Sequence, residues 1–304
     1  MCGIVGYLRK AKATDERSIG AVMLDMLHAL STRGPDSTGI ALYGSPADNE
    51  LRVWVKLGDD NPHPGIEQAV LERVGALTSI HDAVREGECL RLAVRPVDAA
   101  NLEREILQAA PAAEVFSIGT RLELMKQVGR PDALDRQFHI AELSGTHSIG
   151  HTRLSTESRV DISHSQPFWT HGVTDLAVVH NGHITNYHKL RHRFEHRGYR
   201  FYTENDSEII GPYLQEQMKT GSTLQEAMER STRELDGTFC YLVASAEGLG
   251  FAKDFFCAKP LVMVETDDYV ALATEEIAIR RAFPDAPPPR EPGANAMQFW
   301  SLGE

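Results

Sequence analysis

The chain has 304 residues and a hydrophobic content of 42%, which is enough to build a substantial core in one large domain or two. Its net charge of −12 argues against a protein that binds nucleic-acid backbones, because such proteins concentrate Lys and Arg on one face. No apolar run is long enough to span a bilayer, and no basic stretch and apolar signal core follow Met1, so we expect a cytosolic protein.

The first predicted elements are a short buried strand over residues 3–8 and a helix over residues 19–30. The helix is indicated by apolar residues that recur every three or four positions. We expect Thr14 or Asp15 to cap its start and Gly34-Pro35 to stop it.

The next part of the chain changes in character at about residue 59. Before that point, residues 40–43 and 51–57 favour a hairpin around Gly44-Ser45-Pro46. Residues 59–117 then read as a small α/β insertion, with these elements in order: a helix over 66–77, a strand over 90–94, a helix over 102–107 and a strand over 115–116.

The second half of the chain returns to strands. We expect strands over residues 149–153 and 176–180, a helix over 187–196, a hairpin formed by 239–244 and 249–255, and a last strand over 297–300. Strands in hairpins with helices between them, outside the insertion, predict an α+β fold in which stacked antiparallel sheets are covered by helices.

Cys2 is the residue that points most directly to chemistry. Removal of Met1 would leave a thiol and a free α-amine on the same residue. Because the α-amine titrates near 8 and a thiol at about 8.5, the amine can accept the thiol proton and later return it to a leaving group. The alternative is an ordinary buried cysteine that happens to stand at the second position.

Four further blocks, in this order, decide between the two: Arg33-Gly34-Pro35-Asp36-Ser37-Thr38-Gly39, residues 150–158 (GHTRLSTES), His180-Asn181-Gly182 and Asn205-Asp206-Ser207-Glu208. Together with Cys2, they resemble the glutaminase domain of class II glutamine amidotransferases, which have the N-terminal nucleophile hydrolase fold. The resemblance runs over about residues 1–43 and 117–281. It implies a four-layer αββα sandwich of two antiparallel sheets, with residues 1–304 as one glutamine amidotransferase type-2 domain and 59–117 as an insertion within it.

The resemblance also implies a role for each block. Cys2 is the expected nucleophile, and the Asn181 side chain and the Gly182 backbone N–H are the expected oxyanion hole. Arg153 is expected to bind the α-carboxylate of glutamine and Asp206 its α-ammonium group. These pairs agree with elementary chemistry, because the arginine fork donates two parallel hydrogen bonds to a carboxylate.

Thr156 is a further expected substrate contact, whereas Arg33 and Asp36 are expected to support the loop around the N-terminus. Two alternatives stay open: Arg153 as a surface ion-pair residue and Asp206 as the N-cap of the helix that follows it. The chain also departs from the family pattern, because Leu154 stands where several members have an aromatic residue. Gln166 stands where a histidine is common before Pro-Phe.

We expect neither a bound metal nor a cofactor. His188, His192 and His196 have a helical spacing that metal sites use, but the Lys and Arg residues between them indicate a solvated basic helix face. The four cysteines, Cys2, Cys89, Cys240 and Cys257, lie far apart without a CxxC pair, so they favour reduced thiols over disulfides or a zinc site, and the last two are expected in the core.

The reaction implied by the resemblance is cleavage of the glutamine side-chain amide through a Cys2 thioester. The sequence contains no phosphate-binding GxxxxGK[ST] loop, and no acceptor domain follows Arg281, so we expect a separate synthase-like subunit to use the ammonia or the γ-glutamyl group. Blocks such as residues 116–119 and 145–147 resemble stand-alone glutaminase subunits of glutamate synthase-like complexes, N-methylglutamate synthase among them. The insertion is a candidate docking element for that partner or else a surface subdomain without this role.

Two other classes of function remain at this point. A different N-terminal nucleophile hydrolase, such as an acylase, would not need Arg153 and Asp206. A non-catalytic subunit would keep the fold and bind glutamine as a regulatory signal.

Overall fold

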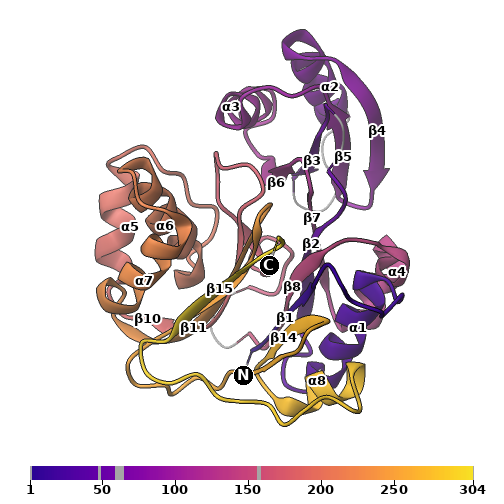
Figure 1. Cartoon of the computed structure of the whole chain (residues 1–304). Coiled ribbons are helices and arrows are strands. Elements are labelled where there is room, and N and C mark those ends of the chain that lie inside the picture. Colours follow the sequence, from indigo (N-terminus) through magenta and orange to yellow (C-terminus); the bar gives the residue numbers. More distant parts are fainter. Residues whose placement is uncertain (1, 47–48, 59–64, 156–158, 304) are drawn as a thin grey trace.

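A computed structural model describes residues 2–46, 49–58, 65–155 and 159–303. Two antiparallel sheets stack face to face, and helices cover the outer face of each one (Figure 1). The expected α+β sandwich with four layers is therefore confirmed. Within the described residues, no helix combines the length and the apolar composition that a membrane crossing requires.

The six-stranded sheet carries the start of the chain in its interior. Its order is β13-β14-β1-β8-β2-β7. The strands are β1 (Gly3–Arg9), β2 (Ser37–Tyr43), β7 (Leu122–Val128), β8 (His147–Arg153), β13 (Val262–Glu265) and β14 (Tyr269–Ala273). Because β1 lies between β14 and β8 and is almost completely buried, the residue before Gly3 is held at the end of a central strand.

The five-stranded sheet has the order β15-β12-β11-β10-β9. Its strands are β9 (Phe168–Trp169), β10 (Ala177–Ile184), β11 (Gly237–Ser245), β12 (Gly248–Lys253) and β15 (Met297–Ser301). The expected hairpin is confirmed, since β11 and β12 pair antiparallel across a short turn. Apolar side chains from both sheets form the core between them.

Helices close the two outer faces, as Figure 1 shows. The six-stranded sheet is covered by α1 (Ile19–Leu30), α4 (Pro131–Phe138), α8 (Glu276–Ala282) and the short η1 (Ile140–Glu142), and the five-stranded sheet by α5 (Tyr187–Glu195), η2 (Asp206–Ile209), α6 (Ile210–Lys219) and α7 (Leu224–Glu234). The cap of α1 is Ser18, whose hydroxyl accepts a hydrogen bond from the Ala21 amide, and so the expectation of Thr14 or Asp15 was wrong. Ser18 immediately precedes the first helical residue, as an N-cap must.

A third sheet with the order β4-β5-β3-β6 stands at one end of the sandwich (Figure 1). It contains β3 (Leu51–Lys56), β4 (Ile80–Glu86), β5 (Cys89–Val94) and β6 (Glu114–Gly119), and the helices α2 (Ile66–Leu77) and α3 (Ala99–Ala109) belong to it. The third sheet contains β4 and β5 from the predicted insertion, but it also includes β3, which precedes residue 59, and β6, which ends beyond residue 117.

The expected hairpin between residues 40–43 and 51–57 was wrong. Strand β2 pairs with β7 and β8 in the six-stranded sheet, whereas β3 pairs with β5 and β6 in the third sheet. The two strands are separated by residues 44–50, which is longer than a tight hairpin turn, so packing in two different sheets decides their partners.

Candidate active site

Cys2 extends from the N-terminal end of β1. The register that pairs Gly3 with Thr152 places Cys2 beside the end of β8, where Arg153 lies. A Cβ atom on Gly3 would come within 2.8 Å of the Thr152 hydroxyl and 2.9 Å of the Leu30 side chain. Close packing of β1 against β8 and α1 therefore favours glycine after the thiol.

A cavity of about 630 Å³ opens at this point between the ends of β1, β8 and β10. Five residues singled out in the sequence line it together: Cys2, Arg153, Asn181, Gly182 and Asp206. They come from segments that are far apart in the chain, so the fold brings them to one place. Thr156, the sixth expected contact, lies outside the described residues.

Arg153 is buried, with 4% of its surface exposed. One guanidinium nitrogen, Nη1, donates a hydrogen bond of 2.8 Å to the Arg159 carbonyl. Burial lowers the pKa of Arg153, an effect that the negative charge of an ionised Cys2 opposes. An arginine still stays protonated near neutral pH, so the cavity contains a fixed positive charge, and its burial shows that Arg153 is not a surface residue.

Asn181 and Gly182 follow one another near the end of β10. Asn181 is 5% exposed, and its Nδ2 atom has no hydrogen-bond partner among the described residues. Buried amide donors are nearly always paired, so an oxygen bound in the cavity would complete this one. Gly182 has a φ of +147°, and a Cβ atom there would lie 2.2 Å from the Thr238 carbonyl oxygen, so the position accepts only glycine.

Asp206 begins η2 but does not cap it. Asn205 is the N-cap, and its side chain accepts a hydrogen bond from the Ser207 amide. The Asp206 Oδ2 atom accepts a 2.7 Å hydrogen bond from the Ile184 amide and lies 3.4 Å from His183 Nδ1. The N-cap alternative is therefore wrong, and the carboxylate is instead fixed at the wall of the cavity.

Three further side chains that line the cavity, those of Gln166, His180 and Ser207, fix the position of β10. Gln166 Oε1 accepts a hydrogen bond from the His180 amide, and Gln166 Nε2 donates to Ser207 Oγ at 2.9 Å. His180 Nδ1 is 2.7 Å from the same hydroxyl, and burial lowers the pKa of His180, which favours the neutral imidazole. This triangle ties the Asn181 backbone to η2, which carries Asp206.

The sequence contained a signal for each member of the triangle but not for its role. His180 and Ser207 belong to two of the blocks, and Gln166 differs from the histidine that is common at its position. What joins them is the pairing of β9 with β10 and the position of η2, which no local pattern reveals.

Arg33 and Asp36 contact the backbone around the cavity. Arg33 Nε donates a 2.9 Å hydrogen bond to the Cys2 carbonyl, and its guanidinium forms an ion pair with Glu275. The Asp36 carboxylate accepts from the Ser155 amide at 2.7 Å. Neither residue lines the cavity, so these contacts position the loops at Cys2 and after β8.

The histidine series lies on α5 and its C-cap. His188 reaches the cavity, His192 is exposed on the helix, and the C-cap residue His196 is also exposed. The Nε2 atoms of the last two are 3.1 Å apart. In the part of the chain that the structure describes, no three His, Cys, Asp or Glu side chains group as metal ligands. The described cysteines are free thiols, with Cys240 buried as expected and Cys257 only half-buried.

Comparison with known proteins agrees with this geometry. Residues 151–281 match a family model described as a glutamine amidotransferase domain. A protein of Methanothermobacter thermautotrophicus named "putative glutamine amidotransferase" is 36% identical over 289 residues, covering 92% of this chain and 93% of that protein. The glutamine amidotransferase-like protein GlxB of Rhizobium meliloti is 34% identical and covers 99% of this chain and 98% of its own.

Larger proteins match over part of their length. The glutamine–fructose-6-phosphate aminotransferase of Shewanella oneidensis is 33% identical over 118 residues, which are 39% of this chain and 19% of that enzyme. Among solved structures, the glutamine phosphoribosylpyrophosphate amidotransferase of B. subtilis superposes with a TM-score of 0.63 at 17% identity. The match covers 99% of this chain and about half (49%) of the B. subtilis chain, so it shows a shared fold.

Proposed function

This chain belongs to the class II glutamine amidotransferases, which have the N-terminal nucleophile hydrolase fold and use the side-chain amide of glutamine, and we propose that it is a glutaminase whose nucleophile is the Cys2 thiol. The observation that carries the proposal is the single cavity that Cys2 shares with Arg153, Asn181, Gly182 and Asp206. A nucleophile, donors for an oxyanion and groups of both charges for an amino-acid head group are the parts that this reaction requires.

The first step is attack of the thiolate on the side-chain amide carbon of glutamine. After loss of Met1, the α-amine of Cys2 accepts the thiol proton, and a C–S bond forms as the carbonyl becomes an oxyanion. Asn181 Nδ2 and the Gly182 N–H stabilise that oxyanion. Asn181 Nδ2 has no partner among the residues that the structure describes, and this supports the role, because the donor is in place before the charge develops.

The second step breaks the C–N bond. The α-ammonium of Cys2 returns its proton to the leaving nitrogen, ammonia departs, and a γ-glutamyl thioester remains. Water then attacks the thioester, and glutamate leaves as the thiol is restored. Another acceptor in place of water would receive the γ-glutamyl group.

The head group of glutamine is held by opposite charges. Arg153 binds the α-carboxylate and Asp206 the α-ammonium group, and Thr156 adds a further contact. The fixed charge of Arg153 and the anchoring of Asp206 to the Ile184 amide support this orientation. Arg33 and Asp36 act indirectly, through the backbone at Cys2 and Ser155.

The experiment is a glutamine assay on Met1-free protein that follows glutamate and ammonia together with intact mass. Wild-type protein should release both products and, when quenched during turnover, carry one γ-glutamyl group on Cys2. Cys2→Ala should abolish release and labelling. Cys257→Ser is the matched control, because Cys257 is also a half-buried free thiol but lies outside the cavity. Full activity of Cys2→Ala would contradict the proposal.

The ammonia or γ-glutamyl group is used, in this proposal, on a separate synthase subunit of the glutamate synthase type. Family members typically pair the glutaminase with an acceptor synthase domain or subunit. The enzyme of Shewanella oneidensis is named for both glutamine and fructose 6-phosphate. The part that matches this chain is 19% of its length. The relatives of Methanothermobacter thermautotrophicus and Rhizobium meliloti match this chain over 93% and 98% of their own lengths, which supports a glutaminase that works with an acceptor site on another polypeptide.

A further inference from the structure

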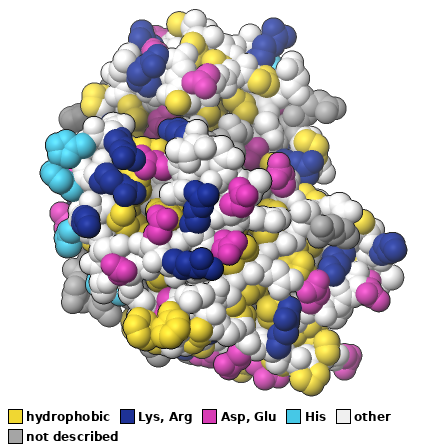
Figure 2. All heavy atoms as spheres, turned by 60° about the vertical axis from the view of Figure 1, so that its left-hand side comes forward, with side chains coloured by type: hydrophobic (Ala, Val, Ile, Leu, Met, Phe, Trp, Pro, Cys, Tyr) yellow, Lys and Arg dark blue, Asp and Glu magenta, His cyan; other side chains and the backbone are white. Residues whose placement is uncertain are grey.

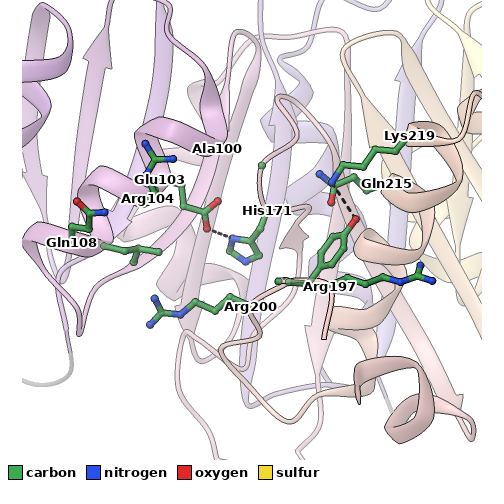
Figure 3. A pocket seen from close by; sticks show the side chains of 13 residues that line it. Ala100, Glu103, Arg104, Gln108, His171, Arg197, Arg200, Gln215 and Lys219 are labelled. Atoms are coloured by element: carbon green, nitrogen blue, oxygen red, sulfur yellow. Dashed lines mark hydrogen bonds and ion pairs between the residues drawn. The ribbon is translucent and has the colours of Figure 1, made fainter. Parts of the chain in front are cut away.

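A second cavity, of about 460 Å³, lies between α3 of the third sheet and the elements over the five-stranded sheet (Figure 3). Its walls come from α3, the loop after β9, the turn that follows α5, and α6. It shares no lining residue with the Cys2 cavity. Its volume is within the range of small-molecule sites, which is roughly 300–1,000 Å³.

Positive side chains gather at this cavity although the chain as a whole carries a net charge of −12. Arg104 comes from α3, where it forms an ion pair with Glu105, and Arg200 and Lys219 come from the opposite wall. Figure 2 shows several Lys and Arg side chains on the side of the molecule that carries α5 to α7. Cations collected around a concave site create a potential that attracts anions.

Arg200 is the cation best placed to bind a ligand. It extends toward α3 in Figure 3 and forms no ion pair with any of the residues that the structure describes. Its guanidinium lies 4.9 Å from the Tyr202 ring, which orients it without neutralising it. Arg197, by contrast, extends away from α3 and pairs with Glu216.

The carboxylate that lines this cavity is already engaged. Glu103 Oε1 is 2.7 Å from His171 Nδ1, and both side chains are largely buried. Burial opposes a charged His171, but the charge and the hydrogen bond of Glu103 raise the pKa of His171 above its ordinary value. The pair is therefore close to neutral when His171 is protonated. Arg104 and Arg197 form ion pairs with Glu105 and Glu216, so the positive charge of the cavity comes mainly from Arg200 and Lys219.

Uncharged polar groups complete the walls. Gln108 comes from α3 and Gln215 from α6, and the buried Gln215 Oε1 atom has no hydrogen-bond partner among the described residues. An acceptor of this kind calls for a donor such as a hydroxyl. Lys219 Nζ is held at the rim by a 3.2 Å hydrogen bond to the Tyr199 hydroxyl.

We propose that this cavity binds a phosphorylated metabolite no larger than a mononucleotide, with its phosphate at Arg200 and a hydroxyl directed to Gln215. Arginine forks suit phosphate because they donate parallel hydrogen bonds to two of its oxygens. A ligand placed here contacts both the third sheet and the sandwich, so it joins the two parts.

The site is connected to the Cys2 cavity by one short segment. Arg200 lines the second cavity, and Glu204, Asn205 and Asp206 line the first. Between them, the Tyr202 and Thr203 amides donate to the Glu208 carboxylate, so the segment is held as a unit. A ligand bound in the second cavity should therefore order residues 200–208. Any effect on glutamine binding rests on the proposed function of Asp206.

Isothermal titration of the full chain with inorganic phosphate, pyrophosphate and AMP tests the site. At least one probe should bind with 1:1 stoichiometry. Arg200→Gln should weaken that binding by about tenfold or more, because one charge-assisted contact is lost. Arg233→Gln is the matched control, since Arg233 is an exposed arginine on α7 outside the cavity and should leave binding unchanged. Failure of all three probes to bind, or equal binding by Arg200→Gln, would overturn the site.

Hydrogen exchange tests the connection. The bound probe should slow amide exchange in residues 200–208 of wild-type protein but not of Arg200→Gln, and unchanged exchange with the probe bound would overturn the connection. Both readouts work equally in Cys2→Ala protein, because neither requires turnover. A failure here is thus distinct from a failure of the glutaminase proposal.

Discussion

The side chains around Cys2 have two kinds of task, and substitutions should separate them. Asn181→Ala removes an oxyanion donor, so kcat should fall by roughly 10²- to 10³-fold while KM changes little. Because Asn181 Nδ2 has no protein partner among the described residues, its loss leaves no group unpaired and should barely alter the melting temperature. Steady-state kinetics and thermal unfolding check both expectations. Wild-type kcat would show that the oxyanion is bound elsewhere.

Arg153→Lys should weaken the binding of glutamine. Lysine keeps the positive charge but lacks the two parallel donors, so KM for glutamine should rise by about tenfold or more, with kcat affected less. Kinetics with glutamine over a wide concentration range measure this. An unchanged KM would favour a different N-terminal nucleophile hydrolase, and glutamine binding without turnover in wild-type protein would favour the regulatory subunit.

Single residues were predictable where a reaction demands a residue type. Cys2, Arg153, Asn181, Gly182 and Asp206 were all chosen from the sequence, and the structure places them around one cavity. The role of Gln166 could not be predicted, because its partners, the His180 amide and Ser207, are near it only after β9 pairs with β10.

At the scale of elements, buried histidines couple the central strands to pH. Burial lowers the pKa of His147 to about 4 and that of His151 to about 3, and both lie on β8. In the unfolded chain, histidine has a pKa near 6.5. Between about pH 4 and pH 6.5 the unfolded chain therefore binds more protons than the folded protein, so the free energy of unfolding should fall as the pH drops below about 6.5. His171 opposes the trend, since Glu103 raises its pKa.

Unfolding at pH 7.5 and pH 5 measures this effect. Each lowered histidine should account for about 2 kcal/mol of lost unfolding free energy at pH 5. His147→Gln removes one titrating group but can still hydrogen-bond the Ser245 carbonyl, so it should reduce the pH dependence by about that amount. His192→Gln, on the exposed face of α5, is the control and should not. An unaltered pH dependence in His147→Gln would contradict the assignment.

Periodicity predicted elements better than it predicted their partners. The helices α1, α2 and α5 and the hairpin of β11 and β12 were expected, because one local pattern specifies each. The pairing of β2 and β3 was wrong, since both are buried and their partners come from distant parts of the chain. The α1 cap was missed by three or four residues, which is more than the one or two residues by which assigned helix ends usually differ.

For the whole molecule, the proposed partner leads to a prediction about rate. The isolated chain should hydrolyse glutamine slowly, and a candidate glutamate synthase-like subunit should stimulate it at least tenfold. The partner needs to prefer the competent state by only about 1.4 kcal/mol to give that factor. Ammonia release with and without the added subunit measures it. Full turnover by the isolated chain would contradict the need for a partner.

The third sheet is our candidate for the contact with that partner. Lys56 and Glu114 are register neighbours on β3 and β6, so deleting residues 59–113 leaves a gap that a short turn can bridge. The shortened protein, once shown to be folded, should keep basal hydrolysis but lose stimulation. Unchanged stimulation would place the contact with the partner elsewhere. Because the deletion also removes α3 from the second cavity, Arg200→Gln is the control: it alters that cavity but leaves the third sheet in place.

The N-terminal mechanism is tested most directly by comparing two forms of the same protein that differ only in Met1. One form is produced with methionine aminopeptidase inhibited, and intact mass establishes which residue begins each chain. Met1-free protein should hydrolyse glutamine, whereas the Met1-retaining form should be inactive, because its Cys2 nitrogen is an amide that cannot accept the thiol proton. Treating the inactive form with purified methionine aminopeptidase should restore activity. Hydrolysis at the full rate by protein that retains Met1 would show that the Cys2 amine is not the base.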